Sequence, residues 1–191
     1  MTEQNSKSAL LVMDLQNGIV ESLGENKEEA IIPWQKAIKA ARDHDIPVIY
    51  VRVGFSKGYP EISPKNKSFS VITQHYGAMT VFDDSTQIYE AVKPEGDEPI
   101  VTKYRISAFA GSNLEMILRS QQIDTVVLSG ISTSGVVLST VRAAADMDFQ
   151  IKVLADACFD RDADVHRVLL EKVFPRQADV LTVNHWIESL D

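Results

Sequence analysis

Residues 125–140, with the sequence TVVLSGISTSGVVLST, constrain the fold of this chain more than any other stretch. They begin with an apolar run typical of a buried β-strand, which breaks at Gly130. Small residues follow, and the sequence then takes up helical spacing. This succession is typical of an open parallel sheet, in which ligands bind at the carboxyl ends of the strands. The helix start would offer free backbone N–H groups to a ligand, and its candidate N-caps are Ser132, Thr133 and Ser134.

The alternation of strands and helices continues along the whole chain. We expect strands at residues 8–15, 48–53, 100–103, 125–129, 150–155 and 178–183. We expect helices at residues 26–45, 112–121 and 163–174, another that follows the turn after the fourth strand and runs to about residue 146, and a short last helix capped by Asn184. Because the strands are apolar throughout, helices should cover both faces of the sheet. The predicted architecture is α/β, a three-layer, doubly wound, six-stranded parallel sheet in one domain over residues 1–191.

Residues 54–99 interrupt this regular pattern. Glycines and prolines are frequent there, and only residues 85–92 favour a short helix. Loops of this length in compact domains are usually functional or disordered. We interpret this excursion, defined here as residues 54–99, as the cover of an active site.

Composition limits the classes of partner. The net charge is −8 over 191 residues, whereas a nucleic-acid-binding protein is expected to carry a basic patch. The single cysteine, Cys158, excludes a disulfide within the chain and favours a reducing compartment. The polar N-terminus has no signal-peptide core, and no apolar run is long enough to cross a bilayer. We therefore expect a cytoplasmic protein that binds neither membrane nor nucleic acid.

Two ionisable residues lie at the ends of predicted strands. Asp14 ends the first strand and Lys103 ends the third, and the turn at Gly130 follows the fourth. In a doubly wound sheet all three could meet at one edge. A carboxylate beside an ammonium group, close to a helix N-terminus, could transfer protons and stabilise an oxyanion. A helix cap for Asp14 and a solvated side chain for Lys103 are the structural alternatives.

The motifs ALLVMDLQNG, TKYRISAF and VVLSGISTSGVV resemble, in this order, those of the isochorismatase-like hydrolase superfamily, which includes the nicotinamidases. The resemblance spans nearly the whole chain and implies the Rossmann-like sheet predicted above. It implies that Asp14 and Lys103 are catalytic and that the Ile131–Ser132 peptide is cis. It also implies an oxyanion hole formed by the backbone N–H groups of Ser132 and Val136. Many family members form dimers or tetramers, so we expect a homo-oligomer that binds a small-molecule substrate.

The sequence departs from this family at the nucleophile. In the cysteine hydrolases the reactive cysteine lies six residues after the glycine that ends strand four, and that position is Val136 here. An aliphatic side chain cannot attack a substrate. Cys158 lies beyond the fifth strand and is expected to pack in the core. A nearby serine, such as Ser134, would need a base, so capping or substrate hydrogen bonding is the favoured role for it.

Isochorismatases of the family also lack the cysteine, and they hydrolyse a vinyl ether with water as the nucleophile. By this resemblance Asp14 would donate the proton, and Lys103 would bind substrate carboxylates or developing charge. Candidate substrate contacts are Gln16, Phe55, Tyr104, Phe109 and Ser134. The segment GFSKGYPEIS after strand two has no histidine, so we expect neither metal nor cofactor. The alternative is an impaired member that binds a small molecule or serves as a structural oligomer.

Overall fold

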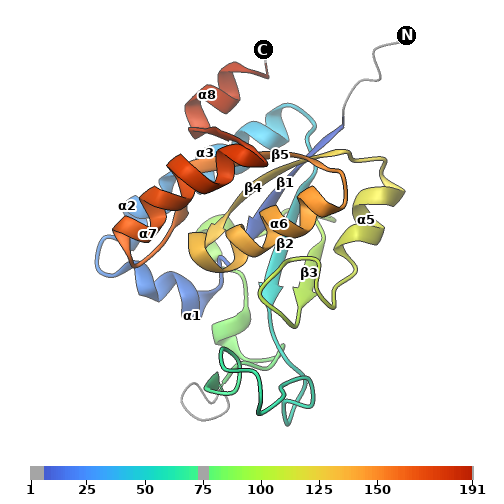
Figure 1. Cartoon of the computed structure of the whole chain (residues 1–191), viewed down its shortest axis with the longest axis vertical. Helices are drawn as coiled ribbons and strands as arrows, with labels where there is room; N and C mark the ends of the chain where they lie inside the picture. The colour runs from blue at the N-terminus through green and yellow to red at the C-terminus, as the bar shows by residue number, and fades with distance from the viewer. Residues whose placement is uncertain (1–6, 73–77, 191) are drawn as a thin grey trace.

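The computed structural model describes residues 7–72 and 78–190, and its centre is one parallel sheet (Figure 1). The sheet has six strands in the order β3-β2-β1-β4-β5-β6, which confirms the predicted α/β architecture. The strands are β1 (Ser8–Met13), β2 (Val48–Val53), β3 (Ile100–Lys103), β4 (Thr125–Ile131), β5 (Gln150–Phe159) and β6 (Asp179–Leu181). Successive strands are added on opposite sides of β1, because β2 pairs with one of its edges and β4 with the other, both in parallel. This is the topological switch point where doubly wound sheets bind ligands.

Strands β1, β4, β5 and β6 end at other residues than predicted, and the ends of β1 and β5 matter most for the site. β1 ends at Met13 rather than at residue 15, because Asp14 takes a left-handed backbone conformation with φ of 61° that interrupts the ladder. β5 continues to Phe159, four residues beyond its predicted end at residue 155. The extension arises because the strand resumes pairing with β4 after an irregularity, placing Gly130 opposite Cys158. Residues 156–159 therefore belong to the sheet and lead directly into the edge that carries the candidate site.

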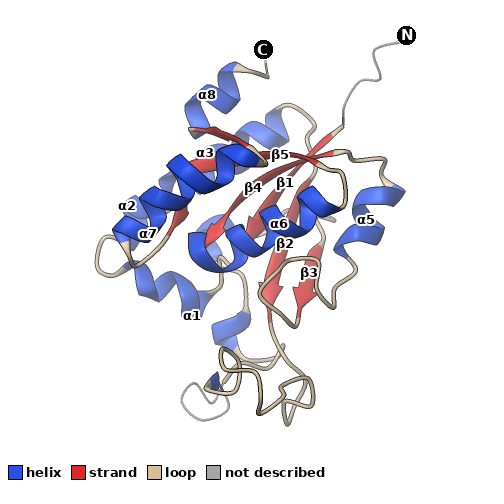
Figure 2. Cartoon of the chain, viewed as in Figure 1, coloured by secondary structure: helices blue, strands red, loops and turns tan. Residues whose placement is uncertain are grey.

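Helices cover both faces of the sheet (Figure 2). They are α1 (Asn17–Val20), α2 (Lys27–Ala30), α3 (Ile32–Asp43), α5 (Leu114–Ser120), α6 (Leu138–Asp146), α7 (Ala163–Val168) and α8 (Val183–Glu188). The predicted helix at residues 26–45 is thus divided into α2 and α3, and Pro33 lies in the first turn of α3, where no N–H donor is needed. The predicted cap at Asn184 is wrong, because the Thr182 hydroxyl accepts the His185 N–H group and Asn184 lies inside α8.

Short 3₁₀ and π turns extend or connect these helices. The 3₁₀ turns are η1 (Glu21–Leu23), η2 (Asp84–Thr86), η3 (Glu90–Val92) and η6 (Phe174–Arg176). The π turns are η4 (Thr133–Val137), before α6, and η5 (Leu169–Val173), after α7. The predicted helix at residues 163–174 is therefore a series of α, π and 3₁₀ turns. A π turn within a helix is often found at a functional site, and η4 directly follows the end of β4.

Two hydrophobic clusters separate the layers. On one face Leu114 and Leu118 of α5 and Val141 of α6 pack against the sheet. On the other face Trp34 of α3 and Trp186 of α8 are fully buried against it. Every residue of β4 is buried, as expected for a strand covered on both sides.

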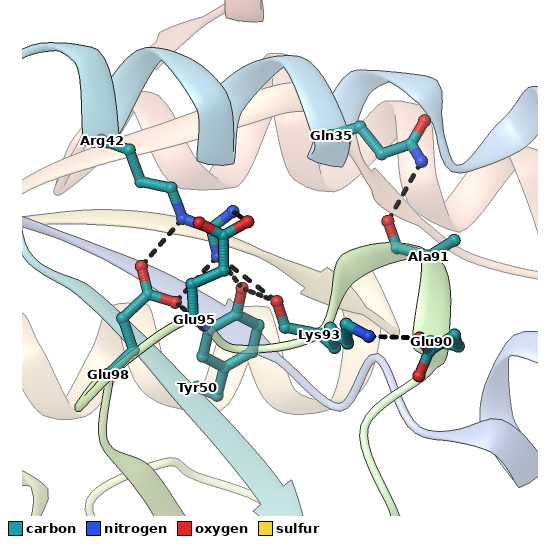
Figure 3. Close-up of polar contacts among 8 residues, drawn as sticks. All are labelled: Gln35, Arg42, Tyr50, Glu90, Ala91, Lys93, Glu95 and Glu98. Atoms are coloured by element: carbon teal, nitrogen blue, oxygen red, sulfur yellow. Dashed lines mark hydrogen bonds and ion pairs between the residues drawn. The ribbon is translucent and has the colours of Figure 1, made fainter.

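The excursion's first described residues leave the carboxyl end of β2, and its last described residues return beside α3 to the start of β3 (Figure 1). Its described part contains two 3₁₀ turns, η2 and η3, instead of the single helix predicted at residues 85–92. Its end is fastened to α3 by Arg42, whose guanidinium Nη2 lies 2.8 Å from Glu98 and whose Nη1 lies 2.8 Å from Glu95 (Figure 3). Arg42 also donates to the Tyr50 hydroxyl and to the Lys93 carbonyl, both at 3.3 Å. These contacts hold the returning chain against the helix before it enters β3.

Candidate active site

The ends of β1 and β3 bring Asp14 and Lys103 together, as predicted, although β2 separates the two strands. Lys103 is opposite Val53 in the β2–β3 register, and its side chain extends past β2 toward β1. Lys103 Nζ lies 3.0 Å from Asp14 Oδ2 and also donates to the Arg105 carbonyl at 3.1 Å. The two charges therefore form a direct, hydrogen-bonded ion pair at the sheet edge.

Both residues of this ion pair are almost completely shielded from solvent. Asp14 is 5% exposed and Lys103 is 2% exposed. Burial raises the pKa of Asp14 above its usual value, while the adjacent Lys103 ammonium opposes this rise. Asp14 Oδ2 accepts from Lys103, whereas Oδ1 is buried and has no hydrogen-bond partner in the described part of the chain. One carboxylate oxygen is thus held in place, and the other remains able to carry or deliver a proton.

Gly130 allows β4 to approach β1 closely beside this pair. A Cβ atom at this position would lie 2.5 Å from the Met13 carbonyl oxygen, so a larger residue would push the strands apart. The next peptide, Ile131–Ser132, is cis, as the family resemblance implied. The close approach places this peptide at the same edge of the sheet as Asp14.

Two side chains from the β5–α7 region hold the turn that follows. The Ser134 N–H group donates to Asp160 Oδ2 at 2.7 Å. The hydroxyl of Thr133, which is completely buried, lies 2.8 Å from His166 Nδ1. Neither Asp160 nor His166 was predicted to belong to the site, and Asp160 was overlooked because β5 was expected to end four residues earlier. Ser132 is the N-cap of η4, but its side chain makes no capping hydrogen bond.

Val136 and Cys158 are both core residues. Val136 is 2% exposed and belongs to the hydrophobic cluster beneath α5 and α6. Cys158, in β5, is 6% exposed within the same cluster. Burial raises the pKa of the Cys158 thiol to about 12, so it is a neutral thiol at physiological pH. A buried, protonated thiol is a packing group rather than a reactive one.

Gln16 has a structural environment that the sequence did not indicate. Its side-chain amide donates to the Val53 carbonyl at 2.8 Å and to the Thr86 carbonyl at 3.1 Å. Its oxygen accepts the Val53 N–H group at 2.9 Å, and the residue is completely buried. The amide therefore joins the ends of β1 and β2 to η2, and these three bonds engage it with backbone groups rather than with a substrate.

The three aromatic side chains predicted as substrate contacts lie in two separate places. Phe55 and Tyr104 share a cluster of rings, with centroids 6.3 Å apart. Phe109 lies elsewhere and stacks on Phe149 at 5.9 Å, with Arg119 above the Phe149 ring. Phe109 thus packs in the core beneath α5 and α6, apart from the rings of Phe55 and Tyr104.

A cavity of about 470 Å³ lies next to the cis peptide. Among the predicted site residues in the described chain, Ser132 alone lines it. Its other walls come from α1, η1, the excursion and the segment after β5, including Ile19, Met79 and Phe159. The residues that the structure describes contain no group of three acidic, histidine or cysteine side chains arranged to hold a metal ion. No helix among them is long and apolar enough to cross a membrane.

Nearly the whole chain is similar in sequence to one family of known proteins. The model of the Isochorismatase domain matches residues 8–185. The isochorismatase family protein YecD of Escherichia coli O157:H7 is 33% identical, over the full length of both chains. Ureidoacrylate amidohydrolase RutB of Pseudomonas savastanoi pv. phaseolicola is 30% identical over 97% of this chain and 81% of its own.

The fold is also that of a solved structure. A cysteine hydrolase from Pseudomonas syringae pv. phaseolicola 1448A superposes with a TM-score of 0.86, covering 96% of this chain and 92% of its own. Its sequence identity is 24%, so this likeness concerns the fold.

Proposed function

The chain belongs to the isochorismatase family, whose members are hydrolases, and we propose that it hydrolyses a small carboxylated molecule with water as the nucleophile. In this proposal Asp14 is the general acid–base and Lys103 is its electrostatic partner. The backbone N–H groups of Ser132 and Val136 would form the oxyanion hole. The proposal also includes a homo-oligomer and needs neither a metal nor a cofactor.

The observation that carries the proposal is the asymmetry of the Asp14 carboxyl group. Oδ2 is fixed at 3.0 Å from Lys103 Nζ, whereas the buried Oδ1 has no partner among the described residues. Burial raises the pKa of this group, which favours the protonated form that a general acid requires. The Lys103 ammonium favours the carboxylate form that a general base requires. A carboxyl group under these opposing influences can both give and take a proton during one catalytic cycle.

Water is the nucleophile in this proposal because we find no suitable side chain among the residues that the structure describes. The family's nucleophile position holds the buried Val136, and the thiol of Cys158 has its pKa raised by burial to about 12. A serine of the turn, such as Ser134, would depend on Asp14 as its base. We therefore assign the chain to the members without a catalytic cysteine.

Vinyl-ether hydrolysis is a reaction that these groups can balance. Asp14 protonates the enol ether carbon, and the resulting cation is attacked by water. The carboxylate of Asp14 then takes the proton that the water releases, and the hemiketal collapses to a ketone and an alcohol. With isochorismate the products would be pyruvate and a dihydrodiol acid, and Lys103 would stabilise the carboxylates or the developing charge.

A second candidate is a protein that binds a small molecule without turning it over. The burial of the ion pair favours it, since Asp14 and Lys103 are only 5% and 2% exposed. Neither residue is among the described residues that line the 470 Å³ cavity. A sealed ion pair of this kind can also be a purely structural feature.

Turnover of isochorismate, measured as pyruvate release, tests the proposal. We expect the parent protein to release pyruvate and a folded Asp14→Asn variant to lose at least about a hundredfold in rate, as expected for removal of a general acid–base. Asp43→Asn, which removes an exposed carboxylate from α3, is the matched control and should retain the parent rate. Equal rates in the parent and in Asp14→Asn would contradict the role of Asp14. No release from the parent would exclude isochorismate and favour the binding protein.

A further inference from the structure

The cavity next to the cis peptide is enclosed by segments from four parts of the chain. Gly18 and Ile19 belong to α1, Met79 and Ser85 to the excursion, and Ile131 to the end of β4, while Phe159 ends β5 and residues 160–161 follow it. Its volume of about 470 Å³ lies within the range of about 300–1,000 Å³ typical of small-molecule sites. It therefore has room for a small organic molecule whose reactive end lies at the Ile131–Ser132 peptide.

The walls are mainly hydrocarbon. Side chains of Ile19, Ile72, Met79, Ile131 and Phe159 line the cavity. A polar ligand body would lose its hydration here and regain few hydrogen bonds, whereas an apolar body gains from leaving water. The hydroxyl of Ser85, which also lines the cavity, is already bonded to the Ala78 carbonyl. The walls thus favour a ligand with an apolar body.

The two ionisable side chains among the described wall residues are Asp160 and Arg161, and they differ in their engagement. Asp160 Oδ2 accepts the Ser134 N–H group at 2.7 Å, and Oδ1 accepts the Asp162 N–H group at 3.3 Å. Although partial burial opposes it, these hydrogen bonds hold the pKa of Asp160 below its usual value. The charge of Asp160 is therefore used to hold the protein's own backbone.

Unlike Asp160, Arg161 is not held by hydrogen bonds to the described part of the protein. It is exposed, and within residues 7–72 and 78–190 it forms no hydrogen bond and no ion pair. Its neighbour Asp162 forms no ion pair with it, and the Asp162 carboxylate instead caps α7 by accepting the Asp164 and Val165 N–H groups, each at 3.0 Å. A guanidinium group presents a planar fork of donors that matches a carboxylate. The cavity therefore combines apolar walls with one cation that is available to a ligand.

We propose that this cavity binds a carboxylate-bearing molecule with an apolar body, and that Arg161 pairs with a carboxylate of that molecule. The apolar body would lie against Ile19, Met79 and Phe159. This inference rests on the proposed function only in placing the reactive end of the ligand at the Ile131–Ser132 peptide, since binding itself needs no turnover. Arg161 is then the residue that determines specificity for an acidic substrate.

Equilibrium binding of simple acids, followed by ligand-detected NMR, tests this assignment. The probes are acetate, butyrate, hexanoate and the uncharged hexanamide. Each added methylene should strengthen binding by about fourfold, because about 0.8 kcal/mol accompanies burial of a CH₂ group. Hexanamide should bind about tenfold more weakly than hexanoate, since it lacks the charge-assisted hydrogen bonds.

Two variants separate Arg161 from a general effect of charge. Arg161→Gln should weaken hexanoate binding by about tenfold and leave hexanamide binding unchanged. Arg167→Gln removes an equal charge from α7, where Arg167 pairs with Asp164 and Glu171, and should bind hexanoate like the parent. Circular dichroism would confirm that both variants fold.

Three results would overturn the assignment. They are equal binding of acetate and hexanoate, unchanged hexanoate binding by Arg161→Gln, and no hexanoate binding by the parent at millimolar concentration. Hexanoate binding should persist in Asp14→Asn, because the probe does not react. Failure of the catalytic proposal would thus abolish turnover without affecting these affinities, and failure of this inference would change the affinities alone.

Discussion

Replacing Lys103 with Met isolates the energetic role of the buried ion pair. The side chains of Lys103 and Asp14 are 3% and 7% exposed, so solvent screens their interaction very little. Methionine preserves most of the volume and removes the ammonium group, which leaves the Asp14 charge buried without a partner. Breaking a buried pair in this way typically destabilises a protein by about 3–5 kcal/mol. We expect a loss of this size in the free energy of unfolding at neutral pH.

The loss of stability in Lys103→Met should depend on pH, and the burial of Asp14 determines the direction of this dependence. The pKa of Asp14 is already raised above 3.8 by burial in the parent, and the ammonium group opposes that rise. Without the ammonium group the pKa rises further, so the folded variant keeps its proton to higher pH than the unfolded chain does. Between the unfolded and folded pKa values the folded state binds more protons, and stability therefore falls as pH rises. The variant should recover part of its stability when the pH is lowered toward 4.

Denaturant unfolding of three proteins across this pH range measures the effect. The proteins are the parent, Lys103→Met and the double variant Lys103→Met/Asp14→Asn. The double variant has no charge at residue 14, so it should lack the added pH dependence and be more stable than Lys103→Met at neutral pH. A Lys103→Met protein whose stability has the same pH dependence as the parent would refute the reasoning, because Asp14 would then not depend on Lys103 for its ionisation.

Two further substitutions test how the site is built. Gly130→Ala would place a methyl group 2.5 Å from a backbone oxygen of β1, and we expect a loss of about 3 kcal/mol in urea unfolding. Gly24→Ala, where nothing lies within 4 Å, should cost only about 1–2 kcal/mol for its positive φ, and equal losses would contradict the close approach. Arg42→Ala should lower unfolding stability by about 1–2 kcal/mol and speed proteolysis of the excursion, because Glu98, whose side chain is 16% exposed, loses its partner. Lys39→Ala breaks an exposed pair and should change stability by less than about 0.5 kcal/mol, so an equal effect of both would contradict this role for Arg42.

The sheet and the ion pair could be predicted from the sequence because they depend on local patterns. Apolar runs identify buried strands, and parallel strands present their carboxyl ends at one edge. Asp14 and Lys103 lie at such ends, so topology alone brings them to one edge even though β2 lies between their strands. The family resemblance then assigned them catalytic roles that composition and spacing could not.

The rest of the site depends on tertiary contacts that carry no local signal. Asp160 and His166 contact residues 134 and 133, which are 26 and 33 positions away in the sequence. Phe109 follows the same strand end as Tyr104, yet it packs against Phe149 in the core, and nothing in the local sequence distinguishes the two rings. Gln16 is polar and lies in a turn, so its complete burial among backbone groups of β2 and η2 was unforeseen. One indication was available for β5, whose apolar residues resume at residues 157–159 after Asp156.

The energetics of Asp14 favour a catalytic role over a structural one. Its left-handed backbone, with φ of 61°, costs about 1 kcal/mol, and the buried Oδ1 without a partner costs about 1–3 kcal/mol. The ion pair with Lys103 does not offset these costs, because buried pairs are often no more stabilising than apolar side chains of similar volume. An apolar pair at these two positions would therefore serve stability as well or better. Since the pair instead places a proton-carrying oxygen at the sheet edge that also carries the Ile131–Ser132 peptide, its chemistry explains what stability does not, and this argues for the hydrolase over the binding protein.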